Sequence, residues 1–165
     1  MPEAVLPPLS ADTQRLSRVV LEGEALGRLS PLQEADRAQA VTDLSAGNLF
    51  SPPGQVGPFA LHLSVQEGRL VLDVRDEADR RLMATLLALG PFRRLIKDYQ
   101  LLVDSHVKAV EEGREARMEA IDMGRRGLHN EGAELLVQRL DRKIAIDFET
   151  ARRLFTLVCV LHQRI

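Results

Sequence analysis

Apolar side chains recur at every second position in two neighbouring stretches of the chain. The first runs from Phe59 to Val65 and the second from Leu70 to Val74, with a Gln-Glu-Gly sequence between them. A period of two predicts strands, and a short glycine-containing turn predicts that they form a hairpin. The apolar run 82–89 has helical propensity as well, but Gly90-Pro91 directly after it makes a new helix start. We therefore expect 82–89 to be the third strand of a β-meander.

Two further strands and four helices complete the expected elements. The β-branched segment 14–21 predicts a first strand, and "KIAID" predicts a short one at 143–147. Ser30 as a cap, Pro31, Gln33 three residues after the cap and Gly47 as a stop predict a helix between them. Apolar residues at helical spacing predict helices over 92–110, about 115–140 and 148–165, the last capped by Asp147 and central to the core.

These elements predict an α+β fold, in which an antiparallel sheet with a β-meander packs against about four helices. Strands and helices are too segregated along the chain for repeated β-α-β units. Residues 1–12 are expected to be a flexible tail, and 13–165 a single domain, which suits the length of the chain. The proline- and glycine-rich segment 49–59 is the longest irregular connection after the tail, and such loops are often functional.

The stretch "MGRRGLHNEG", residues 123–132, lies inside the predicted helix 115–140. Ile121, Leu128 and Leu135 stay in phase across it, which favours one continuous helix. The alternative is a helix that ends near Gly127 and a second that begins at Asn130. In one helix the three glycines cost about 2–3 kcal/mol relative to alanine. Close packing by Gly124 and Gly132 against a neighbouring element is the favoured reason, and a bound ligand is the other.

Composition describes an ordinary globular protein. The chain is 45% hydrophobic and 28% charged, and its net charge of -2 argues against a general nucleic-acid or membrane-surface coat. Its one cysteine, Cys159, stands among apolar residues and is expected to be buried and inert. The beginning of the chain has no signal-peptide pattern, and no run suits a spanning helix, so we expect a cytoplasmic protein.

Polar residues of 123–132 and its flanks make the one candidate site. Asp122, Arg126 and His129 fall on one stripe of the helix, with Arg125 beside them and Asn130 towards the exposed side. Arginines bind anions, and a histidine serves in hydrogen bonding or acid–base chemistry. The ordinary interpretation is an Asp122–Arg126 ion pair one helical turn apart and a structural histidine. The helix from residue 92 adds Arg93, Arg94 and Lys97, which would form a basic patch with Arg125, Arg126, Arg152 and Arg153 if the helices converge.

Three hypotheses follow, and the sequence leaves open whether the protein is an enzyme. The first is a non-enzymatic binding or regulatory protein for an anionic partner, which is a phosphorylated ligand, RNA or an acidic protein surface. Arg93, Arg94, Arg125 and Arg126 would make the contacts, and His129 and Asn130 would add specificity. The second is a small enzyme with His129 as general acid or base and Arg126 as substrate anchor. In the third, these groups only join helices or build a homodimer interface.

Other chemistry has little support in the sequence. The four histidines are scattered, no paired metal ligands occur at useful spacing, and no phosphate-loop or dinucleotide pattern is present, so we expect no metal and no cofactor. "GRRG" matches the glycine-x-x-glycine loop of KH domains in letters, but a long helix precedes it where that loop needs a strand and a short helix. Nucleic acid is therefore a weakly supported partner, and no membrane association is expected.

The segments "GPFRRLIKDY", "IDMGRRGLHNEGAELL" and "DFETARRLFTLVCVLH" are similar to those shared by uncharacterised protein family two-six-two, small proteins of alphaproteobacteria. The resemblance covers most of the chain from about residue 13. Gly90 stands where such relatives have threonine, which weakens the helix cap. The resemblance implies a bacterial, cytoplasmic setting, and it implies no activity, cofactor or catalytic residue.

Overall fold

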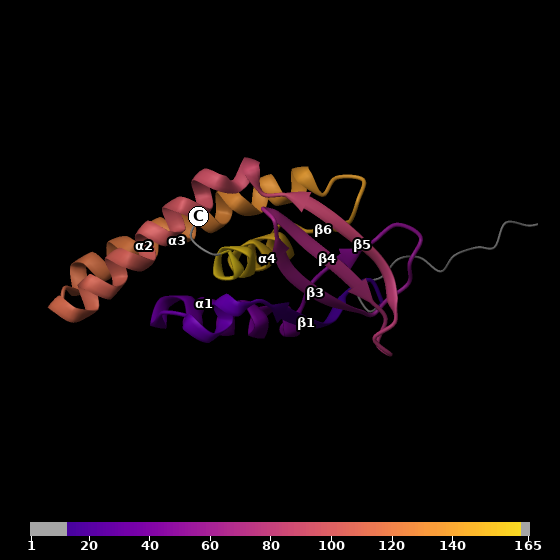
Figure 1. Ribbon diagram of the computed structural model, residues 1–165, viewed down its shortest axis with the longest axis horizontal. Helices are drawn as coiled ribbons and strands as arrows, with labels where there is room; N and C mark the ends of the chain where they lie inside the picture. Colours follow the sequence, from indigo (N-terminus) through magenta and orange to yellow (C-terminus); the bar gives the residue numbers. More distant parts are fainter. Residues whose placement is uncertain (1–12, 163–165) are drawn as a thin grey trace, which may run out of the picture.

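The computed structural model describes residues 13–162. A four-stranded sheet lies at one end of the molecule and four α-helices at the other (Figure 1). Helix α4 runs between α1 on one side and the α2–α3 pair on the other, and it also contacts β1 and β3. This arrangement confirms the α+β fold class, with four helices against the sheet. The tail expected over residues 1–12 lies outside the described part of the chain.

The β-meander is confirmed with all three of its strands. Strands β3 (Phe59–Gln66), β4 (Arg69–Arg75) and β5 (Arg81–Ala88) pair antiparallel in sequence order. The β3–β4 turn places Glu67 and Gly68 both at positive φ, the conformation of a two-residue hairpin turn. The segment 81–88 is a strand and not a helix, because its alternate side chains meet the inward-facing residues of β4, as Leu87 meets Leu70.

The first strand differs from expectation in its direction. Strand β1 (Leu16–Glu22) pairs parallel with β3, so the sheet is mixed, with the order β1-β3-β4-β5. Helix α1 (Pro31–Ala46) lies between these strands in the chain and returns it to the end of the sheet where β1 began. The expectation of an antiparallel sheet is therefore wrong for this one strand, because a single β-α-β crossover precedes the meander.

The predicted caps are present at both helices that they define. Ser30 Oγ accepts from the Gln33 amide and the Gln33 side chain accepts from the Ser30 amide, which completes the capping box of α1. Asp147 accepts from the Thr150 amide at the start of α4 (Phe148–Leu161). A short 3-10 helix, η1 (Glu24–Arg28), precedes α1. Two-residue strands β2 (Phe50–Ser51) and β6 (Ala145–Ile146) pair antiparallel, so the loop 49–59 and the "KIAID" segment meet.

The two longest helices form a hairpin. The 3-10 turn η2 (Gly90–Phe92) leads into α2 (Arg93–Glu112), and α3 (Glu115–Arg139) follows after a tight turn. Gly113 ends α2 in the left-handed region, with φ of 66°. Figure 1 shows that the pair extends away from the sheet beyond the rest of the molecule.

Helix α3 is continuous through 123–132, so the two-helix alternative is wrong. A Cβ on Gly132 would overlap the Phe155 ring of α4, which makes this glycine a close-packing residue. Gly124 lies at ordinary contact distance, 3.6 Å, from Leu102 of α2, and nothing lies within 4 Å of a Cβ on Gly127. Packing therefore requires a glycine at 132, and at 124 it brings the helix into ordinary contact with a neighbouring side chain.

The hydrophobic core lies where the sheet, α4 and the α2–α3 pair meet. From Leu154 to Leu161 every residue of α4 is buried, which confirms that this helix is central. The Phe92 and Phe155 rings stack with centroids 5.8 Å apart in this core. Cys159 is buried among them, as expected from its apolar neighbours.

Candidate functional site

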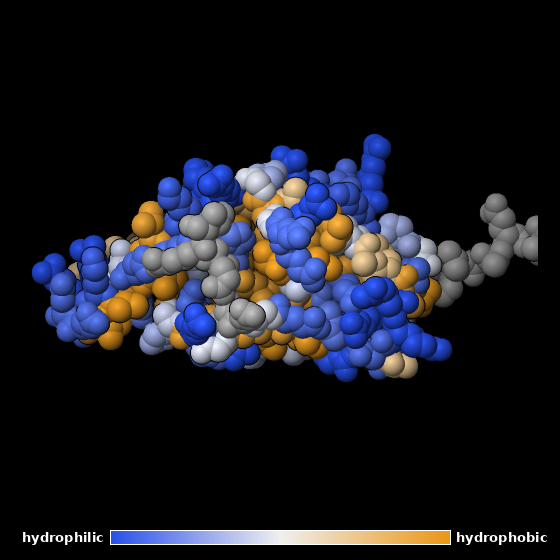
Figure 2. Space-filling view, viewed as in Figure 1, coloured by the Kyte–Doolittle hydropathy of each residue, from blue (hydrophilic) through white to orange (hydrophobic). Residues whose placement is uncertain are grey.

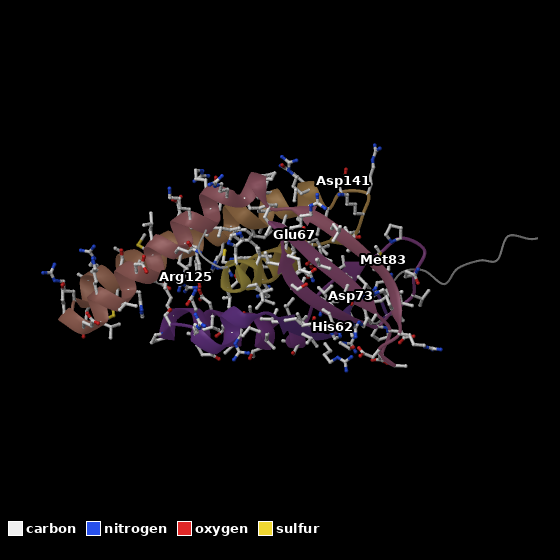
Figure 3. All side chains as sticks on the ribbon, viewed as in Figure 1. His62, Glu67, Asp73, Met83, Arg125 and Asp141 are labelled. Carbon is white, nitrogen blue, oxygen red and sulfur yellow. The ribbon has the colours of Figure 1, made fainter. Side chains whose placement is uncertain are left out.

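Arg125 is held between helices by two carboxylates. Its Nη1 lies 2.7 Å from Asp36 Oδ1 on α1, and its Nη2 lies 2.5 Å from Asp122 Oδ1 on α3. Asp36 is only 5% exposed and accepts a second hydrogen bond, of 2.7 Å, from the Tyr99 hydroxyl on α2. Figure 3 shows Arg125 in this position between α3 and α1. The group formed by Asp36, Tyr99, Asp122 and Arg125, here called the interhelical network, therefore ties three helices together.

The electrostatics of the interhelical network follow from burial. Burial raises the pKa of Asp36, and the Tyr99 hydrogen bond and the Arg125 charge offset this only in part. Burial also raises the pKa of Tyr99, followed by the Asp36 charge and hydrogen bond. At the exposed end, the hydrogen bond from Arg125 lowers the pKa of Asp122. Tyr99 is thus a neutral donor, and Asp122 is an ionised acceptor at the rim.

His129, the candidate catalytic residue, is enclosed in the core. Its side chain is 2% exposed and lies between the rings of Tyr99 and Phe155, at centroid distances of 5.7 and 6.4 Å. Burial, followed by the charges of Arg125 and Arg152, lowers its pKa to about 3, so the ring is neutral near pH 7. His129 lines neither of the two cavities described below. A general acid or base needs contact with open space, so the enzyme hypothesis gains no support here.

The other predicted residues of α3 and α2 mostly join helices. Arg126 Nε pairs with Asp122 Oδ2 at 3.1 Å, the expected contact one turn away. Asn130 Oδ1 accepts from Arg152 Nε of α4 at 2.9 Å. Arg94 pairs with Glu131 across α2 and α3. Arg94 and Arg126 are each paired with a carboxylate, so these two arginines do not make a surface of unbalanced positive charge.

Arg93 differs from the other predicted arginines because it lines a cavity. This cavity of about 520 Å³ lies along α2, where Lys97 and Gln100 join Arg93. Leu89, Ile96 and Leu101 supply apolar wall, and Asp104 and His162 also line the cavity. Within residues 13–162 the side chains of Arg93 and Lys97 form no ion pair or hydrogen bond. The size is that of a small-ligand site.

A second cavity of about 310 Å³ adjoins the first. Gln100, Asp104 and His162 line both, so the two share a wall on α2 and at the end of α4. The second one adds Arg28, Ser30 and Gln33 from the start of α1. No sequence pattern predicts either cavity, because their walls come from segments far apart in the chain.

An ionic cluster on the outer face of the sheet was also missed. His62 Nδ1 lies 2.8 Å from Glu22 Oε1, and its Nε2 lies 3.1 Å from Asp79 Oδ1. On the neighbouring strand, burial alone would raise the pKa of Asp73, but hydrogen bonds from Arg81 and Arg75 outweigh it and lower the pKa. The alternation of β3 and β4 does turn His62 and Asp73 to the same outward face (Figure 3), and this is the signal that the sequence offered. The carboxylates of this ionic cluster are paired with arginines or with His62, as Asp73 is with Arg75 and Arg81.

Residues 13–162 contain neither a metal-ligand cluster nor a membrane-spanning helix. Over residues 13–162, no three His, Cys, Asp or Glu side chains come together as metal ligands. In the same part of the chain no helix has the length and apolar composition needed to cross a membrane.

Comparison with known proteins gives one family. The model of the uncharacterised protein family UPF0262 matches residues 13–164. A UPF0262 protein of Granulibacter bethesdensis is 68% identical, covering 96% of this chain and 95% of its own. UPF0262 proteins of Acidiphilium cryptum and Maricaulis maris are 63% and 48% identical and cover 91% and 94% of this chain and 93% and 98% of their own. No solved structure matches the chain.

Proposed function

The chain belongs to the uncharacterised protein family UPF0262, and we propose that it is a non-enzymatic binding protein that holds a small anionic ligand in the cavity along α2. One observation carries this proposal. Arg93 and Lys97, one turn apart on α2, line the same cavity, and neither has a counter-ion within the described residues. An anion placed between them gains two charge-assisted hydrogen bonds.

The character of the cavity narrows the ligand. Its lining holds two cations against one carboxylate, that of Asp104, so an anion is favoured over a cation. Leu89, Ile96 and Leu101 give it apolar wall, which suits a ligand with a hydrophobic part beside its charge. A phosphorylated or carboxylated small molecule fits this description better than RNA or a broad acidic protein surface, because the two cations lie in a cavity.

Arg94 and Arg125, which the sequence also suggested as anion contacts, are not part of the proposed binding site. Arg94 and Arg125 already pair with Glu131 and with Asp36. An anion would have to displace a carboxylate to reach either guanidinium. We place the protein in the bacterial cytoplasm as part of the same proposal, in keeping with its single, enclosed thiol.

Titration calorimetry with phenyl phosphate and inorganic phosphate as probes tests the proposal. We expect phenyl phosphate to bind more tightly than inorganic phosphate, because its ring meets the apolar wall, and both to bind less tightly as salt rises. Arg93→Ala and Lys97→Ala should each weaken phenyl phosphate binding by about tenfold or more, the loss of one hydrogen bond to a charged group.

Arg126→Ala is the matched control. Arg126 is 66% exposed, carries the same charge and lies on α3, where it pairs with Asp122. It should leave phenyl phosphate binding unchanged. Binding that survives Arg93→Ala and Lys97→Ala undiminished, or that responds equally to Arg126→Ala, would refute the assignment to this cavity.

A further inference from the structure

The two edges of the sheet are built differently. At one edge, β1 carries the exposed charges of Arg18 and Glu22, and its register with β3 is irregular between Leu16 and Arg18. At the other edge, β5 carries no charge between Leu82 and Ala88. Charged residues and irregular pairing are the usual means by which proteins prevent an edge strand from pairing with another chain. The β1 edge has charges near both of its ends and an irregularity at its beginning.

Protection of β5 is confined to its beginning. Arg81 is its only charged residue, and the register shift with β4 lies next to it, between Val74 and Arg75. Leu82 is the residue left without a partner by this shift, and from Met83 onwards the strand is regular and contains no proline. In the described part of the chain β4 is the only strand that pairs with β5, so the outer backbone N–H and C=O groups of 82–88 face outwards without a ladder.

Apolar side chains accompany this open backbone. Ala84, Leu86 and Ala88 are exposed on the outer face, and Leu86 is 52% exposed. Figure 2, seen as in Figure 1, shows apolar surface around the end of β5 that leads to α2, and polar surface where the strand begins. An edge that is long, uncharged and apolar favours addition of another strand.

We propose that β5 pairs antiparallel with β5 of a second copy of this chain, which joins the two four-stranded sheets across a two-fold axis. Such a contact is isologous and closes on itself, as the commonest soluble dimers do. It is independent of ligand binding in the cavity along α2.

The side chains of β5 are compatible with this self-pairing. With Thr85 opposite its counterpart, the small Ala84 faces the counterpart of the larger Leu86, and Met83 faces the counterpart of Leu87. Directly opposed residues of an antiparallel pair point to the same side, so the inward side chains of both copies stay on the core side. No charge falls within the paired run, because Arg81 lies beyond it. An uncharged strand can pair along this edge without bringing a charge beside its apolar side chains. The β5 strand of a second copy is such a strand, and it is present wherever the protein is.

Sedimentation velocity on the full chain over about a hundredfold range of concentration tests the proposal. We expect the mass to rise from monomer to dimer. Amide hydrogen exchange within 82–88 should slow as concentration rises, because outward N–H groups gain partners. Leu86→Lys should raise the dimer dissociation constant by at least about tenfold, since the axis brings two new ammonium groups near each other.

Val110→Lys is the matched control for this variant. Val110 is 53% exposed, on α2 and away from β5, so the same change of chemistry there should leave dimerisation unchanged. A native chain that stays monomeric at every concentration would overturn the proposal, and so would a Leu86→Lys dimer of undiminished strength. Circular dichroism checks that the variant folds. If it does not fold, concentration-independent exchange of 82–88 in the native chain overturns the proposal, and slower exchange at high concentration upholds it.

Discussion

At the scale of single residues, the glycines of "MGRRGLHNEG" separate into different roles. Gly132 is fixed by the Phe155 ring, Gly124 is in ordinary contact with Leu102, and Gly127 has open space around it. All three are glycines of the same helix, and they differ only in the direction that each faces around the helix axis. The difference lies in which neighbouring element faces each one.

Alanine substitution should therefore have opposite effects at two of these glycines. Gly132→Ala should lower the free energy of unfolding by about 1–3 kcal/mol, because its Cβ must displace the Phe155 ring in a packed core. Gly127→Ala should raise it by roughly 0.5–1 kcal/mol, because alanine is the better helix former and meets nothing. Urea denaturation measures both. Equal effects of the two changes would contradict the packing assignment.

His129 gives the protein a pH dependence with a definite sign. The folded-state pKa of about 3 lies below the ordinary value of 6.5, so between these values the unfolded chain binds a proton that the folded protein does not. The free energy of unfolding should therefore fall as pH drops below about 6.5. Between about pH 7 and pH 5 this amounts to roughly 1–2 kcal/mol.

His129→Gln isolates this contribution. Glutamine does not titrate, and Asp36, whose raised pKa acts with the opposite sign, is retained in both proteins. The difference in unfolding free energy between native and variant should shrink as pH falls. Parallel pH profiles for the two proteins would show that His129 titrates alike in the folded and unfolded chains.

At the scale of elements, the interhelical network explains how α1 is held against the α2–α3 pair. Arg125 and Tyr99 both reach Asp36, whose carboxylate is the shared acceptor. Asp36 and Arg125 are 89 residues apart in the chain. Among the polar residues singled out in α3, Arg125 thus makes the helix-to-helix contact, and Asp122 pairs with Arg125 and Arg126 within α3.

Removing the shared carboxylate should be costly. Asp36→Ala leaves the partly buried Arg125 charge and the buried Tyr99 hydroxyl without their common acceptor, so we expect the free energy of unfolding to fall by roughly 2–4 kcal/mol. Asp36→Asn keeps an acceptor for Tyr99 and should cost less. Thermal and urea denaturation measure both.

Arg94→Ala is the control for this network. Arg94 also joins two helices by an ion pair, with Glu131, but it is 65% exposed, and exposed pairs contribute less than about 1 kcal/mol. If Asp36→Ala and Arg94→Ala destabilise the protein equally, burial is not what gives the network its strength.

At the scale of the whole molecule, the two proposed functions use different parts of the fold. The cavity lies on the helical side, along α2, and the open edge is the outermost strand of the sheet. The outer face of the sheet carries the balanced charges around His62 and Asp73. Leu86→Lys should therefore weaken dimerisation and leave phenyl phosphate binding unchanged, and Arg93→Ala should do the reverse.

The sequence by itself determined what depends on residues a few positions apart. The capping box of α1, the Asp147 cap of α4, the hairpin turn, the period-two strands of the meander and the unbroken register of α3 all rest on local backbone and side-chain chemistry, and the structure has them as expected. The α+β class followed from the order of these elements.

Only the tertiary structure decided the rest. It made β1 parallel to β3, enclosed His129, gave Arg125 its distant partner and set Arg93 and Lys97 in one cavity. Each of these depends on which faces of separate elements meet, and that is fixed by packing the whole core at once. No local pattern states it, because the same arginine or histidine on a helix is a binding group or a structural one according to what lies across from it.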